Sequence, residues 1–217
     1  EDEMFGFAKE YYTFDKWMEI NSPSTPFERY ADDGIVHCRT EDEAKETLEK
    51  LKKRFNQCKL ELHPTKTKIV YCKDKDRTKD YPVTEFDFLG YTFRSMFIKD
   101  KRGRLLFNFL PSVSKKSAKA FRDKIKAMEL HKMSGSKIEM IAERINPMVR
   151  GWLNYFTRYC KSAVKYTIDC LNRRLVKWAM CKYKRFSGHR RNAENWLRQL
   201  AKREPNMFPH WTLGMLP

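Results

Sequence analysis

Two adjacent carboxylates, Asp32 and Asp33, are the residues of this sequence best suited to chemistry. An apolar and aromatic run precedes them, and Gly34 leads into a second apolar run. This pattern predicts a β-hairpin with the acids at its tip, where Gly34 would permit the turn. Two carboxylates at one turn repel each other unless a cation lies between them, and hard oxygen ligands suit Mg²⁺. The alternative is an ordinary surface turn, because Asp and Gly are favoured there without any chemistry.

The charge of the chain is divided unevenly along its length. Residues 1–100 hold 18 Lys+Arg and 21 Asp+Glu, whereas residues 101–217 hold 27 and 7, so the second half is a polycation. Hydrophobic residues make up 41% and aromatic residues 14%, which indicates a folded chain. A folded, aromatic-rich polycation favours nucleic acid as its partner. A membrane surface is less suitable, because no helix is basic on one face and apolar on the other.

The six cysteines give no sign of a metal site or a secreted protein. They form no Cys-x-x-Cys pair, and no histidine falls at zinc-finger spacing. No run approaches the roughly 18 apolar residues of a membrane span, and no signal peptide is visible. We therefore expect a cytoplasmic protein with no membrane partner. The chain starts at Glu1 without an initiator Met, which predicts a piece of something longer.

The first half is expected to mix strands and helices. A capping box, Thr40 followed by Glu43, begins one of the helices. The predicted elements are a helix over 7–20, the acidic hairpin, a helix over 41–58, a loop with a short strand over 60–71, a strand over 86–93 and its partner over 105–109.

The second half is expected to be helical. Ser136 and Glu139 form a second capping box, and Pro147 should kink the helix that contains it. The predicted helices cover 114–131, 136–159, 162–184 and 191–203, and the core stripe of the third is Val164, Ile168, Leu171, Leu175 and Trp178. The chain is thus expected to be α+β over 1–111 and helical and basic over 112–217.

The motifs of the chain, in their order, resemble the reverse transcriptases encoded by group II introns, also called intron maturases. The resemblance spans roughly residues 11–210, and its most specific element is Gly-Trp-Leu-Asn-Tyr. The matching segments are Tyr30-Ala31-Asp32-Asp33 (catalytic hairpin), Leu62 to Thr67 (next palm motif), Phe88-Leu89-Gly90-Tyr91 (primer grip), Asn146-Pro147 with Arg150 to Phe156 (maturase or thumb signature) and Arg173-Arg174 through Trp178 (basic helix).

This resemblance implies RNA-templated DNA synthesis with two Mg²⁺ ions, together with binding of the parent intron RNA to assist splicing. Asp32 would be the principal metal ligand and Asp33 its support. Lys66 would supply a positive charge or a proton near the leaving phosphates, unless it is only a solvated loop lysine. The Phe88-Leu89-Gly90 run would hold the primer end, with Gly90 letting the backbone approach nucleic acid closely. Strand core is the alternative for the first two of these residues.

The resemblance also predicts the architecture: a partial polymerase palm over 1–111, with antiparallel strands and helices, followed by an α-helical basic thumb over 112–217. A palm polymerase needs a third aspartate on an earlier strand, and no segment before Tyr30 offers one. The chain alone is therefore expected to be inactive, with the fingers and the rest of the palm as its missing partner. The alternative is a non-catalytic RNA-binding maturase module that acts as a splicing cofactor.

The expected nucleic-acid partners are structured intron RNA and an RNA template–DNA primer duplex, bound in the cytoplasm in association with RNA or the nucleoid. Basic residues interleaved with aromatic ones suit phosphate contact and stacking on unpaired bases. Trp152, Tyr155 and Phe156 are expected to be thumb core. The predicted RNA-binding residues are Arg150, Arg173, Arg174, Lys177, Lys182, Arg185, Arg190 and Arg191.

Overall fold

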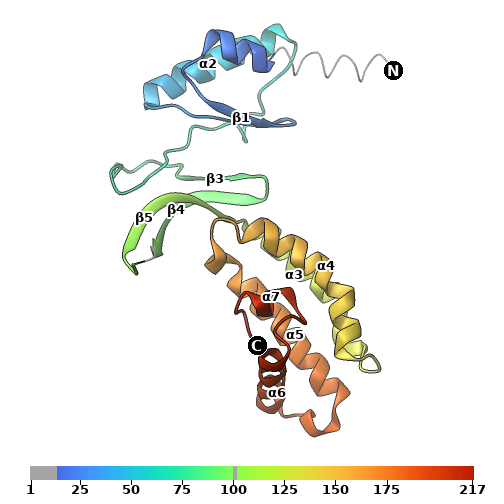
Figure 1. The fold of residues 1–217 in the computed structure, drawn as a ribbon. Coiled ribbons are helices and arrows are strands. Elements are labelled where there is room, and N and C mark those ends of the chain that lie inside the picture. Colours follow the sequence, from blue (N-terminus) through green and yellow to red (C-terminus); the bar gives the residue numbers. More distant parts are fainter. Residues whose placement is uncertain (1–13, 100–101) are drawn as a thin grey trace. The chain divides into compact units, whose positions relative to one another are not determined.

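The computed structural model describes residues 14–99 and 102–217. The chain divides into two compact units between Tyr71 and Cys72. Small antiparallel sheets are combined with helices (Figure 1), which confirms the α+β class. The boundary expected at 111/112 lies inside the second unit, so a functional division at that point stays a prediction. No helix of the described residues is both long and apolar enough to cross a membrane.

The first unit is a small hairpin-and-helix unit. Its elements are a helix over 14–21, β1 (Phe27–Tyr30), β2 (Asp33–Val36) and α2 (Glu41–Gln57). The helix expected over 7–20 is confirmed for its described part, and the rest lies outside the described residues. The N-cap half of the predicted capping box of α2 is confirmed, since the Thr40 hydroxyl accepts from the Glu43 N–H at 3.1 Å. The Glu43 carboxylate accepts from the Arg39 N–H at 2.7 Å, one residue before the expected donor. The Phe14 ring lies 6.1 Å from Phe27 and 5.5 Å from Phe55, centroid to centroid, and joins the three elements.

The short strand predicted within 60–71 was wrong. No residue from 60 to 71 is in a strand, and the sheets of the described residues contain only β1 to β5. A strand needs a neighbour to pair with its N–H and C=O groups. Neither sheet of the described residues pairs a strand with this segment, so an apolar run alone did not produce one.

The sheet of the second unit has the order β3-β4-β5, all antiparallel, and the strands are β3 (Glu85–Phe88), β4 (Tyr91–Lys99) and β5 (Leu105–Val113). The single strand predicted over 86–93 was wrong, because a two-residue turn at Leu89 and Gly90 splits it into a hairpin. Their φ angles are +49° and +79°, and positive φ at both positions suits a tight hairpin. β5 runs through Pro111, which an edge strand tolerates.

The helices of the second unit follow the predicted order. They are α3 (Lys115–Ala127), α4 (Ile138–Phe156), α5 (Lys165–Lys182), α6 (Arg190–Arg203) and the short α7 (Pro209–Thr212). The second capping box was wrong: α4 has Lys137 as its N-cap, without a side-chain hydrogen bond. Ser136 instead closes the preceding turn, with its N–H bonded to the Met133 carbonyl at 3.0 Å. Pro147 lies inside α4 as predicted, and the kink stays a prediction.

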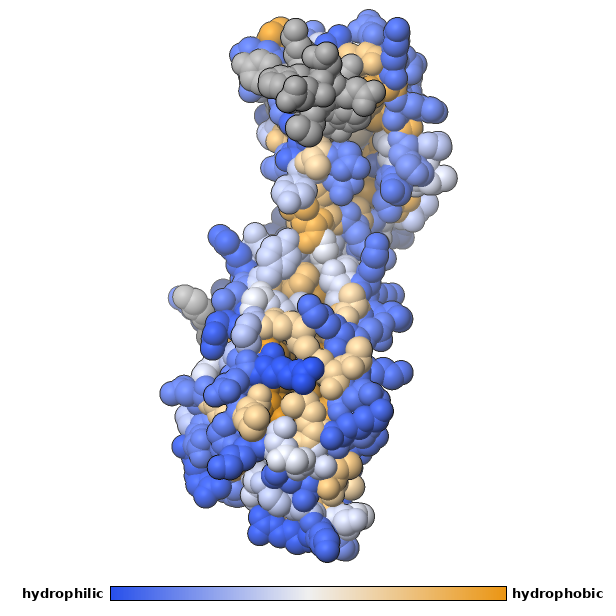
Figure 2. Space-filling model, turned by 90° about the vertical axis from the view of Figure 1, so that its right-hand side faces the viewer, coloured by the Kyte–Doolittle hydropathy of each residue, from blue (hydrophilic) through white to orange (hydrophobic). Residues whose placement is uncertain are grey.

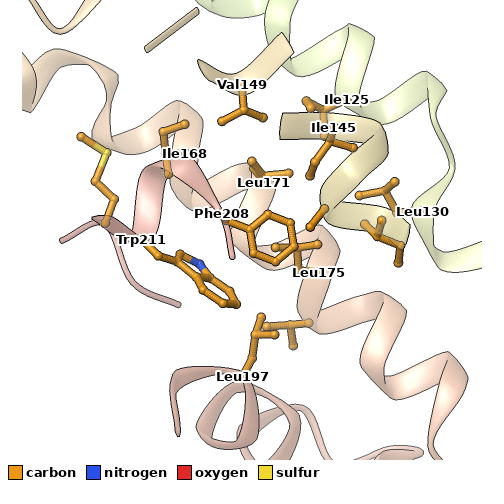
Figure 3. Close-up of a cluster of buried hydrophobic side chains, with 14 of the residues drawn as sticks. Ile125, Leu130, Ile145, Val149, Ile168, Leu171, Leu175, Leu197, Phe208 and Trp211 are labelled. Atoms are coloured by element: carbon orange, nitrogen blue, oxygen red, sulfur yellow. The ribbon is translucent and has the colours of Figure 1, made fainter. Parts of the chain in front are cut away.

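The core of the second unit lies between the helices (Figure 3). The predicted α5 stripe is confirmed, since each of its five side chains is at most 1% exposed. Leu171 and Leu175 face Phe208 and Ile145 in the close-up. The indole N–H of Trp178 donates to the Met133 carbonyl at 3.0 Å, so its polar atom is satisfied inside the core. Because one side of α5 is buried in this core, the helix holds the cations of its other side in fixed positions.

Candidate metal and nucleic-acid sites

The acidic hairpin is confirmed, but its turn lies earlier than predicted. Tyr30 pairs with Asp33, which leaves Ala31 and Asp32 as the two turn residues. The backbone turns at Ala31, whose φ is +52°, and not at Gly34, which lies within β2. A residue with a Cβ in this left-handed region is strained by about 1–2 kcal/mol. The hairpin tip is thus held in a conformation that Gly34 does not explain.

Arg29 holds this strained turn from the side. Its guanidinium donates to both carboxylate oxygens of Asp15, at 2.6 and 2.7 Å, and to the Ala31 carbonyl at 3.0 Å. The hydrogen bonds from Arg29 lower the pKa of Asp15 below its usual value. Asp15 therefore serves as the counterion of Arg29, and Arg29 connects the helix over 14–21 to the turn that carries Asp32.

The two acids fit a divalent metal in kind but not in number. Asp32 and Asp33 are both exposed, and their carboxylate oxygens are the donors that a hard cation prefers. Among the described residues, no group of three His, Cys, Asp or Glu side chains could hold a metal ion. Lys66 is exposed in a turn closed by the Thr67 N–H and the His63 carbonyl at 3.0 Å. Within residues 14–99 and 102–217 it makes no ion pair with either acid.

The predicted primer-grip residues form the turn between β3 and β4. The Tyr155 hydroxyl donates to the Leu89 carbonyl at 2.9 Å, and the Ser114 N–H donates to the Gly90 carbonyl at 3.0 Å. The Tyr91 hydroxyl donates in turn to the Tyr155 carbonyl. One strand residue, Tyr91, and two residues of the helical side, Ser114 and Tyr155, therefore fasten the turn. Phe88 is half-buried at the end of β3.

Gly90 is needed here because of the helices. A Cβ built on Gly90 would lie 2.9 Å from the Ser117 hydroxyl oxygen and 3.4 Å from the Phe156 ring. The close approach that this glycine permits is therefore to α3 and α4. The prediction gave a different reason, approach to nucleic acid, and a role of the Phe88-Leu89-Gly90 turn in holding a primer stays a prediction.

We expect Gly90→Ala to destabilise the second unit by about 1–3 kcal/mol, because it adds a steric contact to an unfavourable φ. Urea unfolding monitored by tryptophan fluorescence measures this change. Gly188→Ala is the matched control: Gly188 has φ +76°, but nothing lies within 4 Å of its added Cβ. Equal losses in the two variants would show that the contact with Ser117 and Phe156 contributes nothing.

The side chains of the maturase-like signature in α4 have two roles: some pack in the core, and others hydrogen-bond to distant segments of the chain. Phe156 is 7% exposed and Trp152 stacks on Phe121 with 4.3 Å between ring centroids, in line with the expected thumb core. Tyr155 was wrongly placed in the core, since it is 47% exposed and bonds the Leu89 carbonyl. Asn146, at the start of the signature, donates to the Met207 carbonyl at 2.8 Å. The signature thus contacts the β3–β4 turn through Tyr155 and the segment that contains Met207 through Asn146.

The predicted RNA-binding cations lie on the surface of the second unit, and Figure 2 shows hydrophilic side chains over much of the helical part. Lys182 is half-buried, and its ammonium donates to the Ser134 carbonyl at 3.0 Å. The Arg185 guanidinium lies 4.7 Å from the centroid of the Phe186 ring. The exposed cations are Arg150, Arg173, Lys177, Arg185, Arg190 and Arg191, and the half-buried ones are Arg174 and Lys182. Part of this set therefore has structural contacts of its own.

Sequence reasoning missed a buried polar network that anchors the C-terminal segment. His210 is fully buried, and its Nε2–H donates to Asn172 Oδ1 at 2.9 Å. Asn172 Nδ2 donates onward to the Met215 carbonyl at 3.1 Å. Burial lowers the pKa of His210 to about 3, so the imidazole is neutral. The signal in the sequence was the position of Asn172, which stands four residues after Ile168 and three before Leu175 and so falls on the buried face of α5.

Comparison with known families agrees with the arrangement of these sites. Residues 8–93 match the model of the reverse transcriptase (RNA-dependent DNA polymerase) family, and residues 118–196 match that of the group II intron, maturase-specific domain. No curated protein matches the chain. Reverse transcriptases use divalent metal ions, and both matched domains imply binding to nucleic acid. The acidic hairpin falls in the first match and the Tyr155 signature in the second, so the chain belongs to the group II intron reverse transcriptase/maturase family.

Proposed function

We propose that this chain is the C-terminal palm and thumb part of an RNA-directed DNA polymerase that also binds its intron RNA to assist splicing. The observation that carries the proposal is the exposed Asp32-Asp33 pair at the tip of a hairpin whose turn Arg29 holds in place. Exposed adjacent acids leave their oxygens available to a metal cation from outside the unit. Two carboxylates are retained at the turn although an uncharged turn would avoid their repulsion.

Mg²⁺ is the ion that we propose for this pair, with Asp32 as its principal ligand and Asp33 as support. When bound, such an ion lowers the cost of deprotonating an attacking hydroxyl and offsets charge on a leaving phosphate. Lys66 would place a positive charge near the same phosphates. Because the described acids are too few to hold the ion, the remaining ligand would come from a palm and fingers portion outside this chain.

The chain by itself is expected to be inactive as a polymerase, because the residues that the structure describes supply no third carboxylate to the proposed metal site. A primer-extension assay on an RNA template, with Mg²⁺ and the purified chain, should give no product. Addition of a separately produced fingers and palm portion should restore synthesis. Mg²⁺-dependent extension by the chain alone that disappears in Asp32→Asn would contradict the proposal.

Nucleic-acid binding is assigned to the basic helices of the second unit. Structured intron RNA and an RNA template–DNA primer duplex are the proposed partners, which places the protein with RNA in the cytoplasm or at the nucleoid. The Phe88-Leu89-Gly90 turn would hold the primer end. The residues proposed to contact phosphates are Arg150, Arg173, Arg174, Lys177, Lys182, Arg185, Arg190 and Arg191.

Changing Lys182, Arg185, Arg190 and Arg191 together to Ala should weaken RNA binding and flatten its salt dependence. Each lost phosphate contact lowers the slope of log affinity against log salt by about 0.7–0.9. Fluorescence anisotropy with a labelled RNA over a salt series measures this slope. The control variant replaces Lys45, Lys50, Lys52 and Lys53 of α2, which removes the same charge from the other unit. Equal slopes in the two variants would place the contacts elsewhere.

A second candidate function is a maturase module that binds RNA without polymerase activity. The lack of a third acid among the described residues is the observation that favours it. The two candidates differ in what Asp32 does, because only the polymerase needs its carboxylate. Splicing support and DNA synthesis measured on one Asp32→Asn variant would therefore separate them.

A further inference from the structure

An exposed tyrosine, Tyr166, lies near one arginine of α3 and one arginine of α5. Tyr166 is 62% exposed. The guanidinium carbon of Arg122, from α3, lies 5.5 Å from the centroid of its ring, and that of Arg173, from α5, lies 5.6 Å away. Both distances fall within the range of a cation–π contact. One surface ring therefore gathers two positive charges from two helices.

The two guanidiniums are held in place by neutral groups. Arg122 donates to the Thr167 hydroxyl at 3.2 Å, and Arg173 donates through Nε to the Asp169 carbonyl at 3.2 Å. Within the described residues neither arginine forms an ion pair within 4.0 Å; the pairs recorded there involve other cations. The carboxylate of Asp169 is likewise in no such pair. Two fixed cations thus share one ring without a direct ion pair among the described residues. The acid nearest to Arg122 in sequence, Asp123, is paired with Lys119. That hydrogen bond is the main cause of the lowered pKa of Asp123, and the charge of Arg122 is a lesser cause.

We propose that Arg122, Tyr166 and Arg173 form a binding site for a backbone phosphate of RNA. A guanidinium fork is suited to phosphate oxygens, and an anion between the two arginines would remove their mutual repulsion. The Tyr166 hydroxyl adds a further donor of the kind that contacts nucleic-acid backbones. The sequence indicates an anion near Arg122, because Lys115, Lys116, Lys119 and Arg122 crowd the start of one helix against its dipole. Tyr166 and its contact with both arginines could not be predicted, because they depend on the packing of α3 against α5.

The surroundings of the site favour an extended polyanion over an isolated phosphate. Lys119 and Lys126 lie on α3 at helical spacing from Arg122, and Lys177 lies one turn beyond Arg173 on α5. Of these, Lys119 is already paired with Asp123 at 2.6 Å. Residues 101–217 hold only 7 acids against 27 cations, so few carboxylates oppose such a strand. This inference rests on the RNA binding proposed above and assigns it a specific contact point.

Arg173→Gln in the full chain tests the site, because Arg173 is exposed and its recorded contacts within residues 14–99 and 102–217 are with its own helix and the Tyr166 ring. With a labelled single-stranded RNA we expect affinity at 0.1 M salt to fall about 5-fold and the salt slope to fall by about 0.7, the value for one phosphate contact. Tyr166→Ala should also weaken binding, whereas Tyr166→Phe keeps the ring and should lose less. Lys202→Gln is the control: it removes one exposed charge from the end of α6.

The outcomes separate this inference from the proposed function. If the wild-type chain binds RNA with no salt dependence, the proposed function itself fails. If the wild-type chain binds with a steep slope but Arg173→Gln behaves like Lys202→Gln, only the site is overturned. As an independent measurement, RNA containing 4-thiouridine should crosslink to the peptide that carries Tyr166, and crosslinks confined to other peptides would overturn the site. Tighter binding of an acidic peptide than of RNA would overturn it as well.

Discussion

Asp32→Asn should lower DNA synthesis by about 10³-fold in the intact reverse transcriptase, reconstituted with its fingers and palm portion. The substitution keeps the shape of the side chain but removes the charge proposed to hold the metal. Loss of several kcal/mol of charge stabilisation in the transition state corresponds to about this factor, since each 1.36 kcal/mol changes the rate tenfold. Single-turnover primer extension with RNA template and Mg²⁺ measures the chemical step.

Two controls make the result specific to the hairpin tip. Asp76→Asn removes a carboxylate from an exposed loop and should leave the rate unchanged. The pair that it breaks is loose, with 3.9 Å between Asp76 Oδ2 and Lys75 Nζ. RNA affinity of the Asp32→Asn variant should also match that of the wild type, because the proposed RNA contacts lie in the second unit. Retained synthesis in Asp32→Asn would show that this carboxylate takes no part in the chemistry and would overturn the metal site proposed at the hairpin tip.

Periodicity predicted the parts of this fold that depend on local pattern. The α5 stripe is buried because Ile168, Leu171 and Leu175 recur at helical spacing, and burial follows directly from that spacing. The acidic hairpin followed in the same way from two apolar runs around turn residues. The position of its turn did not, because Ala31 adopts a positive φ that its residue type disfavours and that Arg29 supports from the side.

The features that the sequence did not predict depend on contacts between distant residues. The run over 86–93 has the alternation of one strand, yet Phe86 stacks on Phe93 across a hairpin with 4.9 Å between ring centroids. Tyr155, 66 residues from Leu89, bonds the turn of that hairpin. The aromatic spacing within α4 predicted that Tyr155 is buried in the core, because local spacing carries no information on a partner as distant as Leu89. The metal-binding and RNA-binding residues stay predictions for a related reason: their ligands lie outside the chain.

The second unit should lose stability as the pH falls below about 6.5, and His210 is the reason. Its pKa is about 3 in the folded chain and 6.5 when the side chain is free. The unfolded chain therefore binds the proton more readily, so the stabilising contribution is complete above pH 6.5 and is lost progressively between 6.5 and 3. Between pH 7.5 and pH 5 the expected loss is about 2 kcal/mol, since one pKa unit is 1.36 kcal/mol.

The structure explains why protonation is so costly at this position. The Nε2–H already donates to Asn172, and Nδ1 is buried with no hydrogen-bond partner, so an added proton at Nδ1 would have no acceptor. Asn172 offers no acceptor for that proton, because its Oδ1 already accepts from Nε2–H and its Nδ2 donates to the Met215 carbonyl. A charged His210 would therefore weaken the attachment of residues 210–215 to Asn172 of α5.

Urea unfolding at pH 7.5, 6 and 5, compared between wild type and His210→Gln, measures this contribution. Gln can keep a donor toward Asn172 but does not titrate, so the loss between pH 7.5 and pH 5 should shrink by about 2 kcal/mol in the variant. His189→Gln makes the same chemical change at an exposed position and should retain the wild-type pH dependence. Identical pH profiles for wild type and His210→Gln would mean that the buried imidazole accepts a proton without cost, and that other groups govern the acid sensitivity of this unit.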